Sequence, residues 1–355
     1  MLESYIEDIL SAPLSPPPPH FQGNSREGRP VAAYRFGRGP FRISLLAGCH
    51  ADEPTGPRLL RHLVSFLGRQ EEGHPLLQDF SWWIVPHANP DGEAANRRWY
   101  SETDDCYSLP RYLQHTVREL PGDDMEYGFP IEGQAGPLRP ENAFIYEFWK
   151  KAGAPFHLHA SLHSMAYSFG PWFLIDPGWV DRSAIIQERC RQKALGLGYA
   201  LNDIDRGGEK GFHRISEGFC TRPSAEAMKA HFLERDMPKT AAFFHPSSME
   251  SIRSFGGDCL TLVSEMPFFT IPNESRSLAW PNPDYEKWRR LMSRWKMGLV
   301  SDDAEDWRLR QAPEDWRLRQ ALQEAHHLGL RAMPVADQMR LQWELVAAGV
   351  EQVVG

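Results

Sequence analysis

The chain has 355 residues, of which 41% are hydrophobic and 24% charged, and its formal net charge is −8. This is the composition of a globular protein with one large domain or two smaller ones. The sequence has neither a basic stripe nor a membrane-length apolar run, so we expect no binding to nucleic acid or membrane. Five irregularly spaced cysteines, and an acidic N-terminus without an apolar signal-peptide core, predict a reducing, cytoplasmic location.

The order of apolar patterns along the chain predicts an α/β fold. Strand-like runs lie at 31–36, 41–47, 80–85, 156–163, 172–175 and 258–264, and the first two are predicted to be joined by a turn. Helical patterns lie at 1–12, 57–67, 142–151, 182–197 and 224–234, and helix formers dominate from residue 284 onward. This alternation favours a mixed, mostly parallel central sheet flanked by helices. In such sheets the loops at the strand ends carry the functional site.

The predicted strand at 41–47 is followed by a small-residue turn that holds His50 and Glu53, three positions apart. A turn of this kind at a strand end can aim both side chains into one cleft. An imidazole and a carboxylate begin the ligand set of a catalytic zinc site, which takes three protein ligands and keeps one position for water. Because a lone H-x-x-E motif is more often a pair of surface residues, the assignment depends on motifs elsewhere in the chain.

A third ligand is available in the predicted strand at 156–163. His157, His159 and His163 occupy odd positions, so they share one face of a regular strand. We prefer His163 because it stands nearest the strand end. The other two histidines are expected to pack in the core or to donate a ring N–H to a neighbouring carboxylate.

Four separated segments follow one another in a fixed order, and together they are more specific than any one alone. They are Gly48 to Gly56 with the H-x-x-E motif, His-Ala-Asn-Pro-Asp-Gly at 87–92, Ser-Leu-His-Ser at 161–164, and Thr-Leu-Val-Ser-Glu at 261–265. This order resembles the zinc carboxypeptidases of the carboxypeptidase A type. Those enzymes carry H-x-x-E, N-P-D-G, a distant L-H-S ligand and a catalytic glutamate at the end of a late strand. The resemblance covers residues 43–267.

The resemblance implies a role for each matching residue. One Zn²⁺ per chain would be bound by His50, Glu53 and His163. Glu265 would be the general base, which accepts a proton from the attacking water and later returns it to the leaving amine. Arg98 matches the position that stabilises the oxyanion in the family, and its neighbour Arg97 is the alternative for that role.

The substrate-binding half of the family pattern is altered. Family members grip the terminal carboxylate of the substrate with an Asn-Arg pair, whereas the best-matching stretch of this chain has Glu126 and Tyr127 there. A glutamate would repel a carboxylate, so we expect atypical recognition of the substrate terminus. Arg253 is a candidate for binding an acidic group from another direction. In place of the family's mobile-loop tyrosine, the sequence offers only His245.

The resemblance also suggests the domain organisation. Residues 1–22 are expected to form an N-terminal segment with a proline-rich connector. Residues 23–300 would form the zinc carboxypeptidase-like catalytic domain, and its irregular stretch at 101–140 is long enough to predict a functional loop. Residues 301–355 would form a helical extension, in which Glu305-Asp-Trp-Arg-Leu-Arg-Gln311 recurs unchanged nine positions later.

Three functions are compatible with these motifs. We favour a zinc-dependent metallopeptidase that hydrolyses an amide bond, a carboxypeptidase with atypical terminal recognition acting on a peptide substrate. The alternative is a small-molecule amide hydrolase resembling succinylglutamate desuccinylase or aspartoacylase, with an acylated amino acid as substrate. The third is a non-catalytic zinc-binding or peptide-binding protein of the same fold, against which the presence of Glu265 argues.

Overall fold

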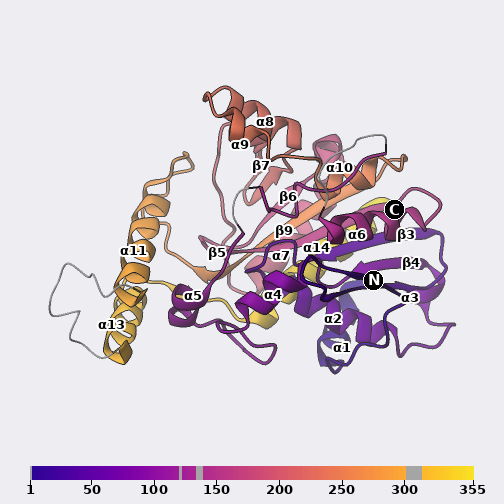
Figure 1. The fold of residues 1–355 in the computed structure, drawn as a ribbon, viewed down its shortest axis with the longest axis horizontal. Helices are drawn as coiled ribbons and strands as arrows, with labels where there is room; N and C mark the ends of the chain where they lie inside the picture. Colours follow the sequence, from indigo (N-terminus) through magenta and orange to yellow (C-terminus); the bar gives the residue numbers. More distant parts are fainter. Residues whose placement is uncertain (1, 120–121, 133–138, 301–313) are drawn as a thin grey trace.

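The computed structural model describes residues 2–119, 122–132, 139–300 and 314–355. Within these ranges ten strands form one mixed sheet through the middle of the molecule, and helices cover it (Figure 1). The predicted α/β class is therefore confirmed. The first copy of the seven-residue repeat, at 305–311, lies outside the described residues, and the second copy begins α13 (Glu314–His327).

The centre of the sheet is parallel and most of its outer pairings are antiparallel. The strands are β1 (Phe21–Asn24), β2 (Pro30–Phe36), β3 (Phe41–Ala47), β4 (Phe80–Val85), β5 (Leu158–Ser168), β6 (Trp172–Ile175), β7 (Arg214–Ser216), β8 (Phe219–Thr221), β9 (Leu260–Thr270) and β10 (Arg331–Ala332). Their order is β1-β2-β4-β3-β5-β9-β6-β8-β7, and β10 pairs with β9. Strands β4, β3, β5 and β9 run parallel to one another, as expected for a sheet that is buried on both faces.

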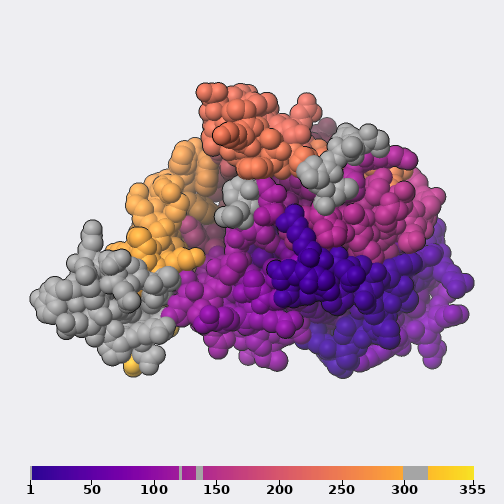
Figure 2. All heavy atoms as spheres, in the orientation of Figure 1, coloured from indigo at the N-terminus to yellow at the C-terminus, as the bar shows by residue number. Residues whose placement is uncertain are grey.

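The helices follow the apolar periodicity closely where that periodicity is strong. Those predicted from the sequence are α1 (Ile6–Ser11), α2 (Thr55–Leu67), α6 (Pro140–Lys150), α7 (Ala184–Gly196), α8 (Ala225–Leu233), α11 (Pro283–Val300) and α14 (Val335–Val354). Shorter helices without a clear sequence signal are α3 (Pro75–Gln78), α4 (Pro90–Asn96), α5 (Leu109–His115), α9 (Pro238–Ala241) and α10 (Ser248–Arg253). Helices α8 and α9 form a lobe above the central body of the molecule (Figure 2).

The side chains of each central strand alternate between two hydrophobic cores. On β4, Trp82 and Ile84 join the core that contains α2, α7 and α14, whereas Trp83 and Val85 join the core that contains α6 and α10. This alternation is the period-2 geometry of a strand with both faces covered. It explains why the strand sequences read as continuous apolar runs rather than as apolar and polar residues in turn.

The first two predicted strands do not pair with each other as a simple hairpin. Strand β4 lies between them and pairs antiparallel with β2 and parallel with β3. The intervening residues 37–40 pack across the segment that leads into β4, where the Arg38 N–H donates to the Leu77 carbonyl at 3.0 Å. The turn residues were recognised correctly, but the strand that fills the gap comes from much later in the chain.

Strands β5 and β9 run further than the sequence predicts. Both were expected to stop near the candidate site residues, but they remain paired through Ser168 and Thr270. His163 and Glu265 are therefore not at strand ends; they are direct cross-strand neighbours within the sheet. Beyond Glu265, β9 also gains an antiparallel partner in β10, which pairs with Phe269 and Thr270.

The last helix of the chain packs against the middle of the sheet. Helix α14 falls in the segment predicted as an extension, yet it contacts β5, β9, α2 and α7. Its Gln342 Nε2 donates to the His163 carbonyl at 3.1 Å, and its Gln338 Oε1 accepts from Thr55 Oγ1 at 2.8 Å. At Gly349 an added Cβ would lie 2.7 Å from Leu262 Cδ1, so a larger residue here would force the Leu262 side chain to move. Across the described residues, no helix combines the length and apolar character needed to span a bilayer.

Replacing Trp343 by alanine is expected to lower the free energy of unfolding by about 3–5 kcal/mol, the usual cost of truncating a buried aromatic side chain. Trp343 is 1% exposed, and its Nε1 donates to the Leu2 carbonyl at 2.9 Å. Urea denaturation followed by circular dichroism measures this loss. Trp280→Ala removes a tryptophan that is 37% exposed and serves as the control, with a smaller loss expected. Equal losses in the two variants would contradict a core role for α14.

Candidate metal centre and active site

The connection from β3 to α2 positions the first two candidate ligands. Strand β3 ends at Ala47, and Gly48 then adopts a left-handed conformation with φ of +67°. A Cβ at Gly48 would lie 2.6 Å from His87 Nδ1, so the backbone here requires glycine. The turn that follows places His50 Nδ1 at 2.7 Å from Glu53 Oε1 just before α2 begins.

The third candidate comes from the adjacent strand β5. His163 Nδ1 lies 3.0 Å from Glu53 Oε2 and 3.2 Å from His50 Nδ1. The donor atoms of the three residues all lie within 4.8 Å of one another. His163 and Glu53 are each only 3% exposed, so the cluster is held in the interior of the fold. Two imidazole nitrogens that face each other beside a carboxylate form the donor set of a catalytic zinc site.

The electrostatics of the cluster are dominated by its own members. Burial alone would raise the pKa of the Glu53 carboxyl, but His50 and His163 hold that pKa far below its usual range. Burial disfavours a charged His163, yet the negative Glu53 outweighs it and raises the pKa of His163 to about 9. The Glu53 carboxylate therefore attracts positive charge into this position, whether it is carried by protons or by a metal ion.

Both histidines are oriented by partners on their far ring nitrogens. His50 Nε2 lies 3.3 Å from Asp124 Oδ1. His163 Nε2 lies 2.8 Å from Ser161 Oγ and 3.4 Å from Glu126 Oε2. Such contacts orient metal-binding imidazoles in proteins and fix which nitrogen faces the metal. They leave the Nδ1 atom of each ring for the metal, and those are the two atoms that converge on Glu53.

Glu265 faces the same cavity from strand β9, opposite His163. Burial, reinforced by the negative charge of Glu53, raises the pKa of the Glu265 carboxyl to about 8, although His163, His50 and Arg118 oppose this shift. A carboxyl with such a pKa can take up and release a proton near neutral pH, which a general acid–base group must do.

A cavity of about 210 Å³ opens onto these residues. Its polar lining is His50, Arg118, Asp124, Glu126, Tyr127, His163, Arg222, Ser247 and Glu265. Its apolar lining is Leu174, Phe212, Pro223, Met228 and Val263. Of the sequence-predicted substrate residues, the structure therefore brings Glu126 and Tyr127 to the cavity. The Tyr127 ring lies edge-on to Phe244 with centroids 5.1 Å apart, and burial raises the pKa of its hydroxyl well above the usual value.

The structure does not bring the other predicted arginines to this cavity. Arg97 and Arg98 are exposed at the end of α4, because the next residue, Trp99, turns into the core with an exposure of 0%. Arg253 is paired with Asp176, with 3.0 Å between Nη1 and Oδ1. Its side chain is half exposed and does not line the cavity either.

Arg118 was missed by the sequence analysis. Its Nη2 lies 3.9 Å from Glu53 Oε1 and its Nη1 lies 3.6 Å from Asp52 Oδ2, so the guanidinium approaches the candidate ligands from the loop after α5. The available signal was general: Arg118 falls in the irregular stretch 101–140, whose length predicts a functional loop. Nothing in the sequence distinguished it from the other arginines nearby.

The remaining histidines make other contacts. His159 is completely buried, and its ring nitrogens lie 3.0 Å from Ser44 Oγ and 3.1 Å from Ser248 Oγ. It shares a strand face with His163, but four residues of strand separate the two by roughly 13 Å. His157 precedes β5, and its Nδ1 accepts from the Arg42 N–H. His245 donates its backbone N–H to the Tyr127 carbonyl, and its side chain is not part of the cavity lining.

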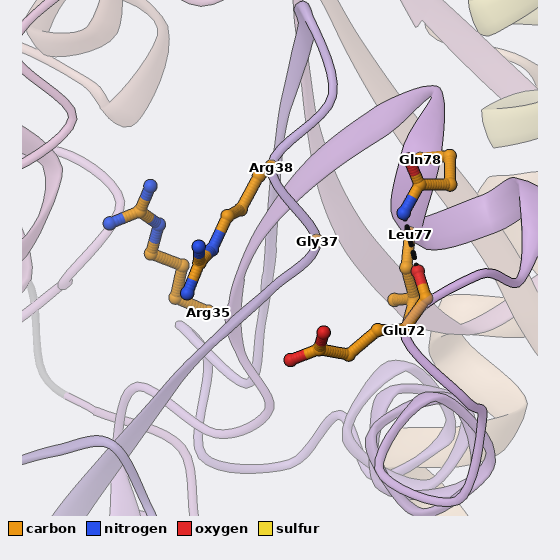
Figure 3. Close-up of a pocket in the computed structure, with 6 residues that line it drawn as sticks. All are labelled: Arg35, Gly37, Arg38, Glu72, Leu77 and Gln78. Carbon is orange, nitrogen blue, oxygen red and sulfur yellow. Dashed lines mark hydrogen bonds between the residues drawn. The ribbon is translucent and has the colours of Figure 1, made fainter.

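A second hollow of about 450 Å³ lies elsewhere on the molecule (Figure 3). Arg35 and Arg38 extend on one side of it and Glu72 and Gln78 lie on the other, with Gln78 Nε2 donating to the Glu72 carbonyl at 2.5 Å. Although it is larger, this hollow contains none of the candidate metal ligands. We therefore place the candidate functional site in the smaller cavity, which is lined by His50, His163 and Glu265.

Comparison with known proteins agrees with this site. A family profile described as zinc carboxypeptidase matches residues 20–168, the stretch that contains His50, Glu53 and His163. The resemblance to the zinc carboxypeptidases is confirmed. Zinc, the metal of the zinc carboxypeptidases, also fits the donors found here. They are two imidazoles and a carboxylate on adjacent elements.

Individual zinc carboxypeptidase relatives match over limited segments. The inactive metallocarboxypeptidase ECM14 of Uncinocarpus reesii is 28% identical over 134 residues, which are 33% of this chain and 22% of that protein. Zinc carboxypeptidase A 1 of Anopheles gambiae is 32% identical over 85 residues, 22% of this chain and 20% of that protein. A metallo-carboxypeptidase structure from Pseudomonas aeruginosa covers 99% of this chain and 68% of that chain, at 15% identity and a TM-score of 0.48. The matched segments span less than a quarter of either curated relative.

Proposed function

We propose that this protein is a zinc-dependent peptidase that hydrolyses an amide bond near the C-terminus of a peptide. The observation that supports this most directly is the convergence of His50, Glu53 and His163, because two of the three, His50 and His163, line one cavity together with Glu265. The donor set suits zinc, which when bound polarises a carbonyl and acidifies a water molecule. The protein residues must then position the substrate, move the protons and stabilise the developing negative charge.

Glu265 is proposed as the proton carrier. Its carboxylate would accept a proton from the attacking water and would later deliver that proton to the leaving amine. Its position supports this role, because it is the direct cross-strand neighbour of His163 and lines the cavity. The raised pKa, caused by burial and by Glu53, suits a group that must hold a proton between the two steps.

Arg118 is proposed as the group that stabilises the oxyanion. The role first assigned to Arg98 requires a cation at the cavity, and Arg118 lines the cavity whereas Arg98 does not. Its side chain is 56% exposed, and its guanidinium is not tightly paired, with 3.6 Å and 3.9 Å to the carboxylate oxygens of Asp52 and Glu53. It therefore has N–H groups available for a substrate oxygen that carries negative charge.

Arg118→Met is expected to lower kcat by about 10²- to 10³-fold, the usual effect of removing one oxyanion donor, with a smaller change in KM. Arg98→Met is the matched control, and its activity should stay within about 3-fold of the unmodified protein because an exposed arginine outside the cavity makes no transition-state contact. Steady-state kinetics on one peptide measure both variants. A large loss in Arg98→Met with an active Arg118→Met would return the role to Arg98.

The function itself is tested with a mixed library incubated with the zinc-loaded protein. Peptides with free C-termini, the same peptides with amidated C-termini, and N-acylated amino acids are included, and products are identified by mass spectrometry. Loss of single residues from free C-termini supports a carboxypeptidase. Turnover of acylated amino acids without peptide cleavage would instead indicate a small-molecule amide hydrolase.

A non-catalytic role is the second candidate function. Two of the curated relatives are named inactive metallocarboxypeptidases, so sequences similar to part of this chain occur in proteins described as lacking activity. The same library decides between the two, because a zinc-binding protein without turnover would release no product from any of the three substrate classes while retaining its metal.

A further inference from the structure

The cavity contains a second arginine whose position is fixed by the sheet. Arg222 directly follows β8, and its backbone N–H donates to the Ile175 carbonyl of β6 at 2.8 Å. The residue is 3% exposed and lines the same cavity as Glu265. A guanidinium held this way is preorganised, because little side-chain freedom remains to be lost when a ligand binds.

One terminal nitrogen of the Arg222 guanidinium, Nη2, already has two hydrogen-bond partners. Its Nη2 donates to Glu126 Oε1 at 2.6 Å and to Ser248 Oγ at 2.7 Å. Its Nη1 is buried and has no hydrogen-bond partner among the described residues. A buried charged donor without a partner costs free energy, and such a group in a cavity wall marks a place where a ligand acceptor is missing.

The negative charge of the neighbouring Glu126 does not prevent a carboxylate from binding beside Arg222. Its Oε1 accepts from Arg222 and from Ser248, while its Oε2 faces His163 Nε2 at 3.4 Å. Both carboxylate oxygens are therefore occupied by donors, and the charge of Glu126 is balanced by Arg222. The glutamate that the sequence predicted to repel a carboxylate is thus neutralised, and an N–H of its partner remains available.

We propose that Arg222 binds a carboxylate of the substrate through Nη1 and so takes over the role that the sequence at Glu126 and Tyr127 no longer provides. This inference rests on the proposed peptidase function for its substrate class. The carboxylate is either the α-carboxylate of the terminal residue or an acidic side chain on it. The adjacent wall formed by Phe212, Pro223 and Met228 is apolar and suits the side chain of an apolar terminal residue.

The test uses three N-acetylated amino-acid probes. They are N-acetylphenylalanine, N-acetylphenylalaninamide and the α-amide of N-acetylaspartic acid. Calorimetry on the zinc-loaded protein is expected to show that a carboxylate-bearing probe binds at least about 10-fold more tightly than N-acetylphenylalaninamide, the gain expected from one charge-assisted hydrogen bond. Preference for N-acetylphenylalanine identifies the α-carboxylate, and preference for the aspartate probe identifies an acidic side chain.

Two variants assign the preference to Arg222. Arg222→Lys keeps the charge beside Glu126 but loses the second donor nitrogen of the guanidinium, and the double variant Glu126→Gln with Arg222→Gln removes both charges together. In each, the preference should fall below about 3-fold. Arg253→Lys, at an arginine that the sequence analysis named as a candidate for binding an acidic group, is the matched control and should leave the preference unchanged. A preference that survives both Arg222 variants overturns the inference, because the carboxylate would then bind elsewhere.

A crystal structure of the unmodified protein with N-acetylphenylalanine gives a readout that needs no variant. The inference predicts a carboxylate oxygen within about 3.2 Å of Arg222 Nη1, and a carboxylate beyond hydrogen-bonding distance overturns it. Its failure is separable from failure of the proposed function. Peptide cleavage without any Arg222-dependent preference would contradict the inference alone, whereas Arg222-dependent binding without cleavage would contradict the peptidase function alone.

Discussion

Glu265→Gln is expected to lower kcat for peptide hydrolysis by about 10²- to 10⁴-fold, the range that general acid–base groups contribute. The amide keeps the size of the carboxyl but neither accepts a proton from water nor returns one to the leaving amine. Zinc binding should be unchanged, because the substitution leaves His50, Glu53 and His163 in place. Steady-state kinetics together with the zinc content of the purified variant measure the two effects separately.

The control for Glu265→Gln is Glu274→Gln, which changes an exposed glutamate paired with Lys287 and should leave activity unchanged. The pH profile gives a second check with a defined sign. A general base must be deprotonated, so kcat/KM should rise as the pH increases through the pKa of Glu265, which burial and Glu53 raise to about 8. A bound cation shifts this rise to lower pH, because opposite charge favours the carboxylate. Full activity of Glu265→Gln with zinc bound would remove Glu265 from the mechanism.

Loss of the metal ion is the second change for which we expect a large effect on peptide hydrolysis. His163→Ala is expected to reduce the zinc content from one ion per chain to nearly none at micromolar zinc, and peptide hydrolysis should fall below detection. The remaining pair, His50 and Glu53, supplies only two ligands, fewer than the three that catalytic zinc sites use. Metal analysis after dialysis against a defined zinc concentration, followed by a peptide assay, measures both quantities.

Thermal unfolding provides an independent readout of the same site. Zinc added at about 100 times its dissociation constant should stabilise the unmodified protein by about 2.7 kcal/mol, because it binds the folded state only. His163→Ala should show no such response. His157→Ala is the matched control, since His157 contacts the Arg42 backbone and should leave zinc binding intact. Equal zinc binding by His163→Ala would show that the metal is held elsewhere, because both groups of potential ligands found among the described residues include His163.

The candidate ligands were predictable because their signal is local. His50 and Glu53 sit three positions apart in one turn, and His163 belongs to a strand whose apolar pattern is unmistakable. The preference for His163 over His159 rested on its L-H-S context and on nearness to a predicted strand end, yet His163 lies in the middle of β5. The sheet places His163 at the site, because the preceding residue, Leu162, pairs with Ala47 at the end of β3.

The residues that the sequence missed are those brought in by tertiary structure. Arg118 and Arg222 come from a loop and from the end of a three-residue strand, where no periodicity marks a functional position. The partner of Glu126 lies 96 residues further along the chain, so its charge balance cannot be read from neighbouring residues. Strand order was missed for a related reason, because pairing depends on which distant strand best fills each gap in the sheet.

The contacts of α14 have a consequence for how the active site is assembled during synthesis. When the ribosome has translated residue 334, every candidate catalytic side chain has been made, but the helix that supports β5 through Gln342 and the turn after Glu53 through Gln338 has not. Strands β5 and β9 also lack the apolar cover that α14 gives one of their faces. The candidate site therefore has its full set of supporting contacts only after α14 has been made and has docked.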